Sequence, residues 1–510
     1  MTTVASKIPT ETLCEIFLLL CDGPIALNEL RNQLRSHEFP WAVGQVCRHW
    51  RWAFLSYPTL WSSLSFEEPQ PDACDPSASY IAEMNRRTAL YLKRSEQQPL
   101  TLTVSVLGQI SEKVYTTVWG MLLSFSDRWK WAGLDIKNES MINDLVERRK
   151  KMSILESLTI VVYNVQDNKY STAFETAPLL TELILNCGDR RAGARGTLQT
   201  WPFPWAQLTR LTIDLPTLHF ANNGALRSFL LQFQNIEELH ITPFSVKLDS
   251  DVPECSTIRF PRLRLFGISL DIPWILSFFE TPVLEHLSVC DGFEDVDARY
   301  NYDDEISSFV QRSSCHIRRL TLGNCTLGVA QHVIFFLDHV EELSVEQYSN
   351  VEYAHRIIRD IADSFGRRLY KLPNLRVLEV SCCPGYFEDV VRAAAHLLSV
   401  RSTKSRSGHN IAKLIVTVGW DDCDCDRCNA LNKVSEPIDK ALKYLCLQPS
   451  FTVLSLDSDR WDRTLTVYGS VIGAQVDLTL QYPDGPNAYE FYSKQSSRHI
   501  DILESKRTQE

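Results

Sequence analysis

The most regular feature of the chain is a spacing of apolar residues, apolar-x-x-apolar-x-apolar, that recurs from residue 131 to residue 456. The middle residues of the first six copies, from Leu134 to Phe266, stand 24 to 28 residues apart, and later steps are longer. Alternation within each copy predicts a short strand. The copies are Trp131/Leu134/Ile136, Leu155/Leu158/Ile160, Leu180/Leu183/Leu185, Leu208/Leu211/Ile213, Ile236/Leu239/Ile241, Leu263/Phe266/Ile268, Leu284/Leu287/Val289, Ile317/Leu320/Leu322, Val340/Leu343/Val345, Leu375/Leu378/Val380 and Phe451/Leu454/Leu456, with residues 411–418 as a looser copy.

The segments between the copies carry helical spacing, as in residues 222–233, 273–279, 331–337 and 354–365. A single strand with its return segment cannot bury its apolar face, so neighbouring units must stack. We therefore expect a curved parallel sheet with helices on its convex side. Before the repeats, residues 80–94 and 114–125 predict helices and residues 100–107 a strand. Alternating stretches after residue 461 predict extra strands that close the array.

This period and core resemble the leucine-rich repeat. Residues 317–327, IRRLTLGNCTL, fit best, because Cys325 stands where that family places Asn or Cys, and Cys383 has the same offset after Val380. Most other copies lack this residue, so the repeats are irregular. The resemblance implies an α/β fold, a leucine-rich-repeat solenoid with helices on the convex side.

Residues 8–66 have a different, helical pattern. After Ile8-Pro9, with Thr10 as the expected N-cap, one stripe is formed by Leu13, Ile16, Phe17 and Leu20. A second stripe is formed by Val43, Val46, Cys47, Trp50 and Phe54. Pro58 ends that helix, and Leu60, Trp61 and Leu64 follow. So small a group of helices cannot bury this much apolar surface alone, which indicates a partner.

Three motifs in this region resemble the F-box, in the order that family has them. They are Ile8-Pro9-Thr10-Glu11 (Leu-Pro-x-Glu), Val46-Cys47-Arg48-His49-Trp50 (Val-Cys-[Arg/Lys]-x-Trp) and Tyr57-Pro58-Thr59-Leu60-Trp61 (Pro-x-Leu-Trp). The region most resembles the F-box-like proteins abundant in mushroom-forming fungi. Residues 21–39 lengthen the usual connection after the first helix, and residues 28–34 extend it or add a helix.

The F-box resemblance implies a surface that docks a Skp-type adaptor and, through it, a cullin. The core or face that meets the adaptor would be formed by Ile8, Pro9, Leu13, Ile16, Phe17, Val46, Trp50, Leu60 and Trp61. The alternative is a helical cap on the solenoid, in which Trp50 and Trp61 only pack inward.

The expected organisation has three parts. Residues 1–66 form the F-box-like helical domain, residues 67–125 a connecting segment and the N-terminal cap, and residues 126–510 the solenoid with its C-terminal cap. Residues 67–79, rich in proline, acid and small residues, read as a linker or loop.

Composition narrows the class of protein. A formal net charge of −11 argues against nonspecific nucleic-acid binding. No apolar run has the length that crosses a bilayer, and the first residues lack the pattern of a secretory signal. Cysteines such as Cys14, Cys47 and Cys290 stand within apolar segments, as reduced thiols do. We expect a cytoplasmic or nuclear protein without a membrane or nucleic-acid partner.

No catalytic constellation stands out, so we expect a binding protein, not an enzyme, and no cofactor. The thiols of Cys423, Cys425 and Cys428 have spacing that suits zinc, with Cys446 or His409 as a fourth ligand. Because a second ligand pair at metal spacing is missing, the expectation is a loop of reduced thiols without metal. The acidic residues 291–305 fit no calcium loop and indicate a solvated segment.

Side chains alternate across a strand, so residues between the buried leucines should lie on the concave face. The predicted target-binding residues are Arg210, Glu238, His240, His286, Arg319 and Glu342. Polar neighbours on the same face include Thr212, Asp214, Thr242, Ser288, Thr321, Ser344 and Glu346. This surface of both charge signs suits a protein segment better than a phosphate backbone.

Together these features predict the substrate-recognition subunit of an SCF-type (cullin-RING) ubiquitin ligase, with an adaptor on the F-box and an unknown target protein on the repeats. The alternative is a leucine-rich-repeat scaffold that keeps a relic F-box and has no part in ubiquitination. A third hypothesis is a metal-dependent or thiol-based enzyme built on residues 423–428.

Overall fold

The computed structural model describes residues 8–20, 24–27, 43–67, 78–106, 112–136, 139–148, 151–163, 169–187, 198, 201–215, 217–242, 245–248, 257–269, 273–290, 302–323, 325, 327–346, 353–366, 371–404, 411–418, 435–447, 451–459, 464–471, 474–481, 500–502 and 504–505. By its internal contacts the chain divides into two compact units, Met1–Cys255 and Ser256–Glu510. The boundary lies far from residues 66 and 125, where the sequence suggested changes of domain.

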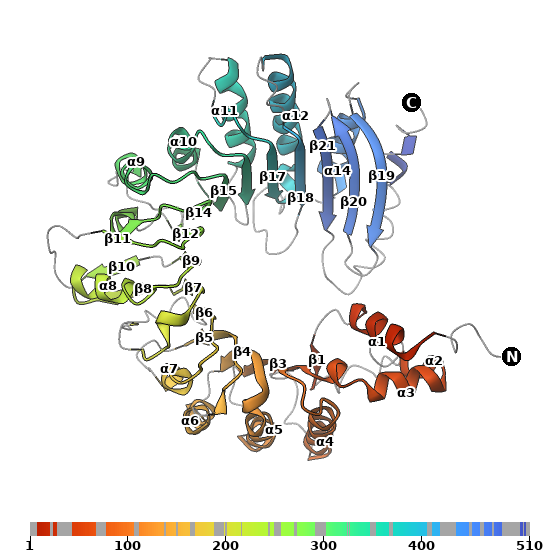
Figure 1. Cartoon of the computed structure of the whole chain (residues 1–510). Helices are drawn as coiled ribbons and strands as arrows, with labels where there is room; N and C mark the ends of the chain where they lie inside the picture. The colour runs from red at the N-terminus through yellow and green to blue at the C-terminus, as the bar shows by residue number, and fades with distance from the viewer. Residues whose placement is uncertain are drawn as a thin grey trace. The chain divides into compact units, whose positions relative to one another are not determined.

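The first unit is a parallel sheet with helices on one side of it (Figure 1). The strands lie in chain order: β1 (Ile25–Ala26), β2 (Ser63–Glu67), β3 (Leu100–Val106), β4 (Trp129–Ile136), β5 (Ser157–Val162), β6 (Glu182–Cys187), β7 (Arg210–Asp214) and β9 (Glu238–Ile241). The covering helices are α4 (Ala78–Arg94), α5 (Glu112–Ser124), α6 (Glu139–Glu147), α7 (Lys169–Phe174) and α8 (Asn223–Leu230). Strands β8 (Thr217–Phe220) and β10 (Ser245–Leu248) pair separately.

Ahead of the sheet come the N-terminal helices, α1 (Thr10–Leu19), α2 (Val43–Val46) and α3 (Arg48–Ser56), and the 3-10 turn η2 (Pro58–Trp61). η2 runs into β2 after Ser62, so no linker separates the helices from the sheet. The expected helical region therefore also supplies strands β1 and β2. Residues 28–34 and 68–77 lie outside the described residues.

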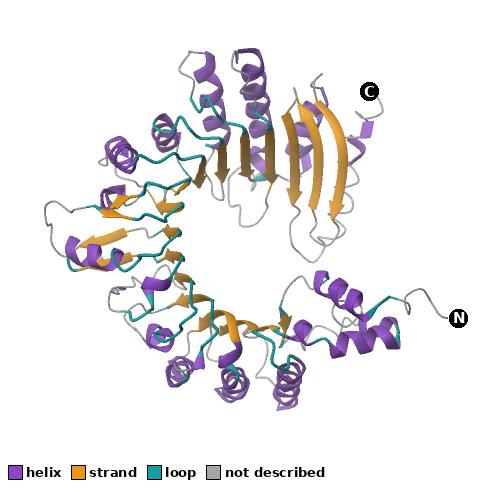
Figure 2. Cartoon of the chain, viewed as in Figure 1, coloured by secondary structure: helices purple, strands orange, loops and turns teal. Residues whose placement is uncertain are grey.

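The second unit repeats the arrangement with a different end (Figure 2). Parallel strands lie in the order β12 (Leu265–Ser269), β14 (His286–Cys290), β15 (Arg319–Gly323), β16 (Glu342–Glu346), β17 (Val377–Cys382), β18 (Lys413–Val418) and β21 (Ala474–Gln481). The antiparallel strands β20 (Thr464–Val471) and β19 (Phe451–Asp459) follow. On one side of the sheet lie η7 (Pro273–Phe278), α9 (Tyr302–Ser313), α10 (Leu327–Phe335), α11 (Ala354–Gly366) and α12 (Phe387–Lys404), and α14 (Ser435–Leu447) packs on α12. Strands β11 (Ile258–Arg259) and β13 (Phe279–Glu280) form a separate pair.

The predicted α/β class with a parallel sheet is confirmed. From β5 to β9 the predicted middle residues stand in register, Leu158 with Leu183, Leu211 and Leu239. In the second unit Phe266 pairs in the same way with Leu287, Leu320, Leu343, Leu378 and Leu414. All of these side chains are buried, so they line the core between sheet and helices. The expected helix at residues 273–279 is the 3-10 helix η7.

The first predicted copy, Trp131/Leu134/Ile136, has the wrong frame. Strand β5 pairs Leu158 with Ala132, not with Leu134, so the copy is Trp129/Ala132/Leu134. Trp129 is fully buried, whereas Trp131 lies on the other face and is half-buried. The two frames differ by two residues and both put apolar residues at their marked positions. Alanine at 132 therefore hid the true register.

Further copies lie upstream of residue 131. In β2, Leu64 pairs with Leu102 of β3, and Trp61, Leu64 and Phe66 have the repeat spacing and are buried. In β1, Ile25 pairs with Leu64. The signal was present in the sequence as Trp61/Leu64/Phe66, but these residues had been assigned to the tail of the helical motif.

The last predicted copy, Phe451/Leu454/Leu456, does not continue the array. Its strand, β19, does not lie beside β18. β19 pairs antiparallel with β20, β20 pairs antiparallel with β21, and β21 takes the place beside β18. The expected extra strands after residue 461 are β20 and β21. The looser copy at residues 411–418 is a regular member, with Leu414 and Val416 buried.

On the helix side of the sheet, arginine side chains connect successive repeats. Arg128 donates to the carbonyls of Ser95 and Gln98, and Arg312 to those of Leu276 and Phe279. Arg401 donates from Nη1 to the Leu375 carbonyl at 2.6 Å. These carbonyls lie at the ends of preceding return segments, where main-chain acceptors lack partners within a helix or strand. Each arginine therefore satisfies main-chain acceptors at the end of one repeat and joins that repeat to the next one.

Candidate protein-interaction surfaces

The N-terminal helices form a small aromatic core. The ring centroid of Phe17 lies 5.5 Å from that of Trp50 and 6.4 Å from that of Phe54. The Phe54 and Trp61 centroids are 4.8 Å apart, and Trp61 Nε1 donates to the Phe54 carbonyl at 3.2 Å. Trp61 also contacts Tyr91 of α4, with a centroid distance of 5.3 Å. The indole is thus shared between the N-terminal helices and the first helix of the sheet.

This packing sorts the predicted adaptor residues into two groups. Leu13, Phe17, Leu60 and Trp61 are buried, so they form intramolecular core and not a docking face. Pro9 and Val46 are exposed, and Ile8, Ile16 and Trp50 are half-buried.

The second predicted stripe fails at Cys47, because the chain forms two helices there instead of one. Cys47 is extended, with φ −160° and ψ 173°, and its Sγ accepts from the main-chain N–H of Trp50 at 3.4 Å as the N-cap of α3. The helical period restarts at this point, so Val46 turns outward and is 53% exposed.

The start of α1 also differs from the expectation. Thr10 lies inside the helix and Pro9 is the N-cap, which makes no side-chain cap bond. The entry is fixed instead by His49, whose Nε2 donates to the Ile8 carbonyl at 3.1 Å. This bond joins two of the F-box-like motifs, 41 residues apart.

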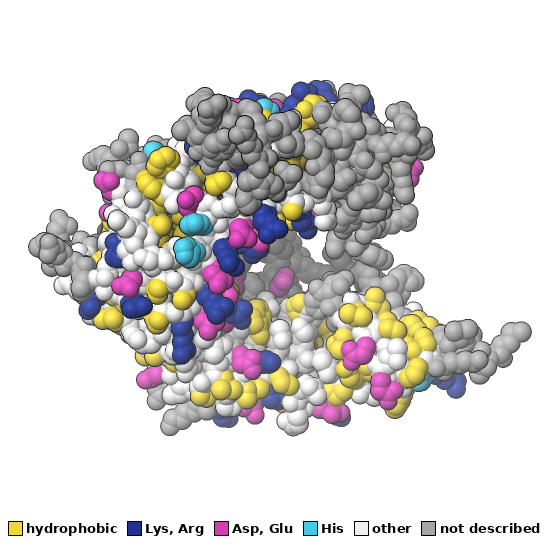
Figure 3. Space-filling model, turned by 45° about the horizontal axis from the view of Figure 1, so that its top comes forward, with side chains coloured by type: hydrophobic (Ala, Val, Ile, Leu, Met, Phe, Trp, Pro, Cys, Tyr) yellow, Lys and Arg dark blue, Asp and Glu magenta, His cyan; other side chains and the backbone are white. Residues whose placement is uncertain are grey.

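Apolar side chains remain exposed on these helices. Trp52 is 60% exposed, and Leu55 of the same helix and Leu19 of α1 are also exposed. We call Leu19, Leu20, Val46, Trp52 and Leu55 the exposed apolar group. Figure 3 shows hydrophobic side chains gathered on this part of the chain, with acidic side chains among them. None of these five except Val46 was among the predicted adaptor residues. The periodicity had assigned Leu20 and Val46 to apolar stripes, and it gave no reason to single out Leu19, Trp52 or Leu55.

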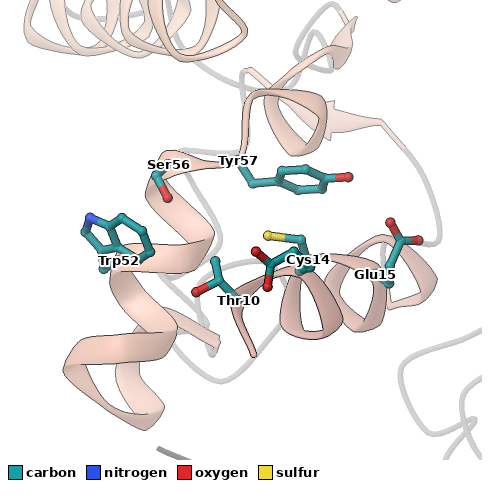
Figure 4. A pocket seen from close by; sticks show the side chains of 7 residues that line it. Thr10, Cys14, Glu15, Trp52, Ser56 and Tyr57 are labelled. Carbon is teal, nitrogen blue, oxygen red and sulfur yellow. The ribbon is translucent and has the colours of Figure 1, made fainter. Parts of the chain in front are cut away.

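A pocket of about 490 Å³ lies between α1 and the end of α3, within the range of roughly 300–1,000 Å³ that ligand pockets occupy. Figure 4 shows Thr10, Cys14 and Glu15 of α1 on one side and Trp52, Ser56 and Tyr57 on the other. Glu11 completes the lining. Burial, together with Glu11 and Glu15, raises the pKa of the Cys14 thiol, so this cysteine stays protonated and is a poor nucleophile.

The second surface is the face of the first-unit sheet that bears no helices, which we call the first open face. Glu182, Arg210 and Glu238 pair in one row across β6, β7 and β9. Arg210 Nη2 donates to Glu182 Oε2 at 2.9 Å. His240 lies on the same face beside Thr212, and burial lowers its pKa while Glu238 partly opposes that shift.

The corresponding face of the second unit is built in the same way. His286, Arg319 and Glu342 form a row across β14, β15 and β16. Arg319 Nε donates to Glu342 Oε2 at 2.6 Å, and His286 Nε2 lies 2.9 Å from Thr321 Oγ1. Figure 3 shows basic and acidic side chains interleaved on the visible face. The six residues predicted for the concave face therefore all lie on open faces, each within its own unit.

Sequence reasoning missed three residues of the first open face, Trp131, Asp135 and Tyr163. Trp131 had been assigned to the core by the wrong frame. The Asp135 carboxylate accepts from Tyr163 Oη at 2.6 Å and from Ser105 Oγ at 3.2 Å. Alternation with the inward residues Leu134 and Ile160 was the available signal for Asp135 and Tyr163, whereas Trp131 is placed only by the pairing of Ala132 with Leu158.

The predicted metal candidates Cys423, Cys425 and Cys428 lie outside the described residues, as does His409, and Cys446 belongs to α14. Where the structure describes the chain, no group of His, Cys, Asp and Glu has the arrangement of a metal site. Residues 291–301 of the acidic run are likewise not described, and residues 302–305 begin α9. Among the described helices, none is both long and apolar enough to cross a membrane.

No protein-family model matches the chain, and comparison of its sequence with curated proteins gave no match.

Proposed function

We propose that the chain is the substrate-recognition subunit of an SCF-type (cullin-RING) ubiquitin ligase, an F-box protein with irregular leucine-rich repeats. The N-terminal helices dock a Skp-type adaptor, and the open faces of the sheet bind a target protein. The chain itself carries out no bond chemistry.

The observation that carries the proposal is the exposure of Trp52, which lines the pocket between α1 and α3, together with the exposed Leu55 on the same helix. Trp52 and Leu55 lie exposed on α3, although the same helix buries Ala53 and Phe54. Exposed aromatic and aliphatic side chains that cluster beside a pocket are typical of a protein interface. These residues lie within the stretch that carries the three F-box-like motifs.

The continuity of the N-terminal helices with β2 supports the division of roles. Trp61 belongs to η2 and also contacts Tyr91, so the adaptor-docking helices share a core with the sheet. A target held on the first open face is then held at a fixed position relative to the adaptor. Such positioning raises the effective concentration of the target near the enzyme that modifies it.

A second function, a binding scaffold with a relic F-box, is favoured by a different observation. Leu13, Phe17, Leu60 and Trp61 all pack inward, and β1 and β2 extend the sheet. These helices thus serve as the cap of the sheet whether or not an adaptor binds. In this role the target-binding faces work without ubiquitination.

A pull-down of the purified full-length chain with a purified fungal Skp-type adaptor separates the two functions. We expect binding by the wild type and its loss in Trp52→Glu and Leu55→Glu, which place a charge in the exposed apolar group. Phe335→Glu is the matched control, because Phe335 is 71% exposed on α10 of the second unit. Absence of adaptor binding by folded wild-type protein would contradict the ligase function and leave the scaffold.

A further inference from the structure

Strand β4 carries an aromatic side chain that lies along the first open face. Trp131 is followed two residues later, on the same face, by Gly133. A Cβ at position 133 would stand 2.7 Å from Cη2 and 3.1 Å from Cζ3 of the Trp131 ring. The indole therefore occupies the space that any larger residue would need. Glycine at 133 lets the ring lie close to the strand.

A fixed carboxylate lies next to this ring along the strand. Asp135 follows Gly133 on the same face, and both of its oxygens are engaged, Oδ1 by Tyr163 and Oδ2 by Ser105. Two hydrogen bonds orient a carboxylate without exhausting it, because each oxygen can accept a second donor. We call Trp131, Gly133, Asp135 and Tyr163 the Trp131 shelf.

The charge on the open face of the strands that follow the shelf is negative. On the described strands β4 to β9, the carboxylates that face the same way are Asp135, Glu182, Asp214 and Glu238, and the guanidinium of Arg210 is already paired with Glu182. At the start of the strands, Lys130 and Glu156 form an ion pair at 3.4 Å and offset each other. An excess of carboxylates around an aromatic ring favours a cation, because both the charge and the ring face attract it.

We propose that the Trp131 shelf binds a lysine or arginine side chain on an extended segment of a partner protein. The cationic head and its alkyl stem stack on the Trp131 indole, and the head donates a hydrogen bond to the Asp135 carboxylate. Glu238 and Asp214 attract further basic residues of the same segment. This inference deepens the target-recognition role proposed above, and it rests on the first open face alone.

A carbohydrate is the competing occupant, since sugar rings also stack on tryptophan. A neutral sugar can donate hydrogen bonds to the carboxylates on β6 to β9 but carries no charge for them to attract, whereas a basic segment has both. The charge therefore favours the peptide.

The test begins with phage-displayed random twelve-residue peptides selected on the full-length protein. We expect enrichment of sequences with two or more lysines or arginines. Synthetic fluorescein-labelled copies are then measured by fluorescence anisotropy. Loss of a cation–π contact predicts binding about 5- to 30-fold weaker to Trp131→Ala than to wild type. Trp131→Phe should restore part of it, and Asp135→Asn should weaken binding and reduce its salt dependence.

Matched controls separate the shelf from general effects of charge or ring loss. Glu237→Gln removes an exposed carboxylate that precedes β9 and is not part of the row formed by Glu182, Arg210 and Glu238. Phe335→Ala removes an exposed aromatic ring of the second unit. Both should bind the peptides as wild type does, and thermal unfolding should show that Trp131→Ala is folded.

Several outcomes would overturn the proposal. They are enrichment of acidic or uncharged peptides, no enrichment at all, or equal binding of lysine peptides to wild type and Trp131→Ala. Trp131-dependent binding to a glycan array without peptide binding would establish the carbohydrate instead. Adaptor binding is measured separately. Absence of adaptor binding with peptide binding intact would contradict the ligase function and support the Trp131 shelf. Adaptor binding without peptide binding would support the ligase function and contradict the shelf.

Discussion

The indole N–H of Trp61 donates a 3.2 Å hydrogen bond to the main-chain carbonyl of Phe54, and the two rings lie 4.8 Å apart. The bond links η2 to the body of α3, and the same indole reaches Tyr91 of α4 on its other side. The guanidinium carbon of Arg94 lies 4.4 Å from its ring centroid. A single side chain thus connects three elements of the first unit.

Trp61→Ala is expected to be the most destabilising change in the N-terminal helices. Removing a fully buried indole costs about 3–5 kcal/mol in the free energy of unfolding. The half-buried Trp50 serves as the comparison, and Trp50→Ala should cost clearly less. Chemical denaturation of both variants measures the difference, and an equal loss would contradict the assignment of Trp61 to the core.

Cys47 is expected to act as a helix cap and not as a reactive thiol. Its Sγ accepts from the Trp50 N–H, the role that serine fills well at the N-cap, the residue just before a helix. Cys47→Ser should therefore keep the stability of wild type or exceed it, while Cys47→Ala should lose about 1 kcal/mol. Thermal unfolding distinguishes them; a loss as large in the serine variant as in the alanine variant would argue against the cap.

Arg401 is expected to be essential for stability, because it holds the main chain just before β17. It is 1% exposed and donates to the carbonyls of Leu372 and Leu375. Burial lowers its pKa to about 10, so it remains charged at neutral pH. Arg401→Met leaves these buried acceptors without a donor and should cost about 2–4 kcal/mol.

The exposed Arg392 of the same helix provides the control for Arg401. It pairs with Glu388 one turn earlier, and Arg392→Met should cost no more than about 1 kcal/mol. Urea denaturation of the two variants compares them. Equal stability of both would show that the Leu372 and Leu375 carbonyls find other donors.

His240 predicts a loss of stability on acidification. Burial holds its folded-state pKa below the ordinary histidine value of about 6.5, so the unfolded chain binds the proton first as the pH falls. The contribution of neutral His240 is complete above pH 6.5 and declines below it until the folded-state pKa is reached. His240→Gln should flatten that part of the stability curve and match the wild-type trend at pH 8. An unchanged slope between pH 5 and 6.5 in the variant would refute this.

The sequence predicted the strand frame well wherever small residues did not compete with large ones. From Leu158 to Leu239 and from Phe266 to Leu414, large apolar residues alternate with polar ones, so only one choice of inward-facing residues is consistent with the pattern. At β4 both frames are apolar, and the inward residue is Ala132, so hydrophobicity alone favoured the larger Trp131. Only pairing with β5 resolves the choice, and that is a long-range contact.

The buried residues of the N-terminal helices were harder to predict for a related reason. Val43 to Phe54 has one continuous helical spacing, but extended backbone at Cys47 divides it and reverses the exposure of Val46. Nothing in the spacing marks that break. Which motif residues face inward depends on packing against Tyr91 and β3, more than 25 residues beyond the motif.

The sharing of Trp61 also bears on how such chains diversify. A domain joined by a free linker can be exchanged between proteins as a cassette. Here Trp61, Leu64 and Phe66 belong both to the end of the helical segment and to strand β2 with the turn before it. A hybrid chain that received its first sixty residues from elsewhere would have to inherit this triplet and a fitting Tyr91, so recombination breakpoints should fall after α4 and not at the end of the motif.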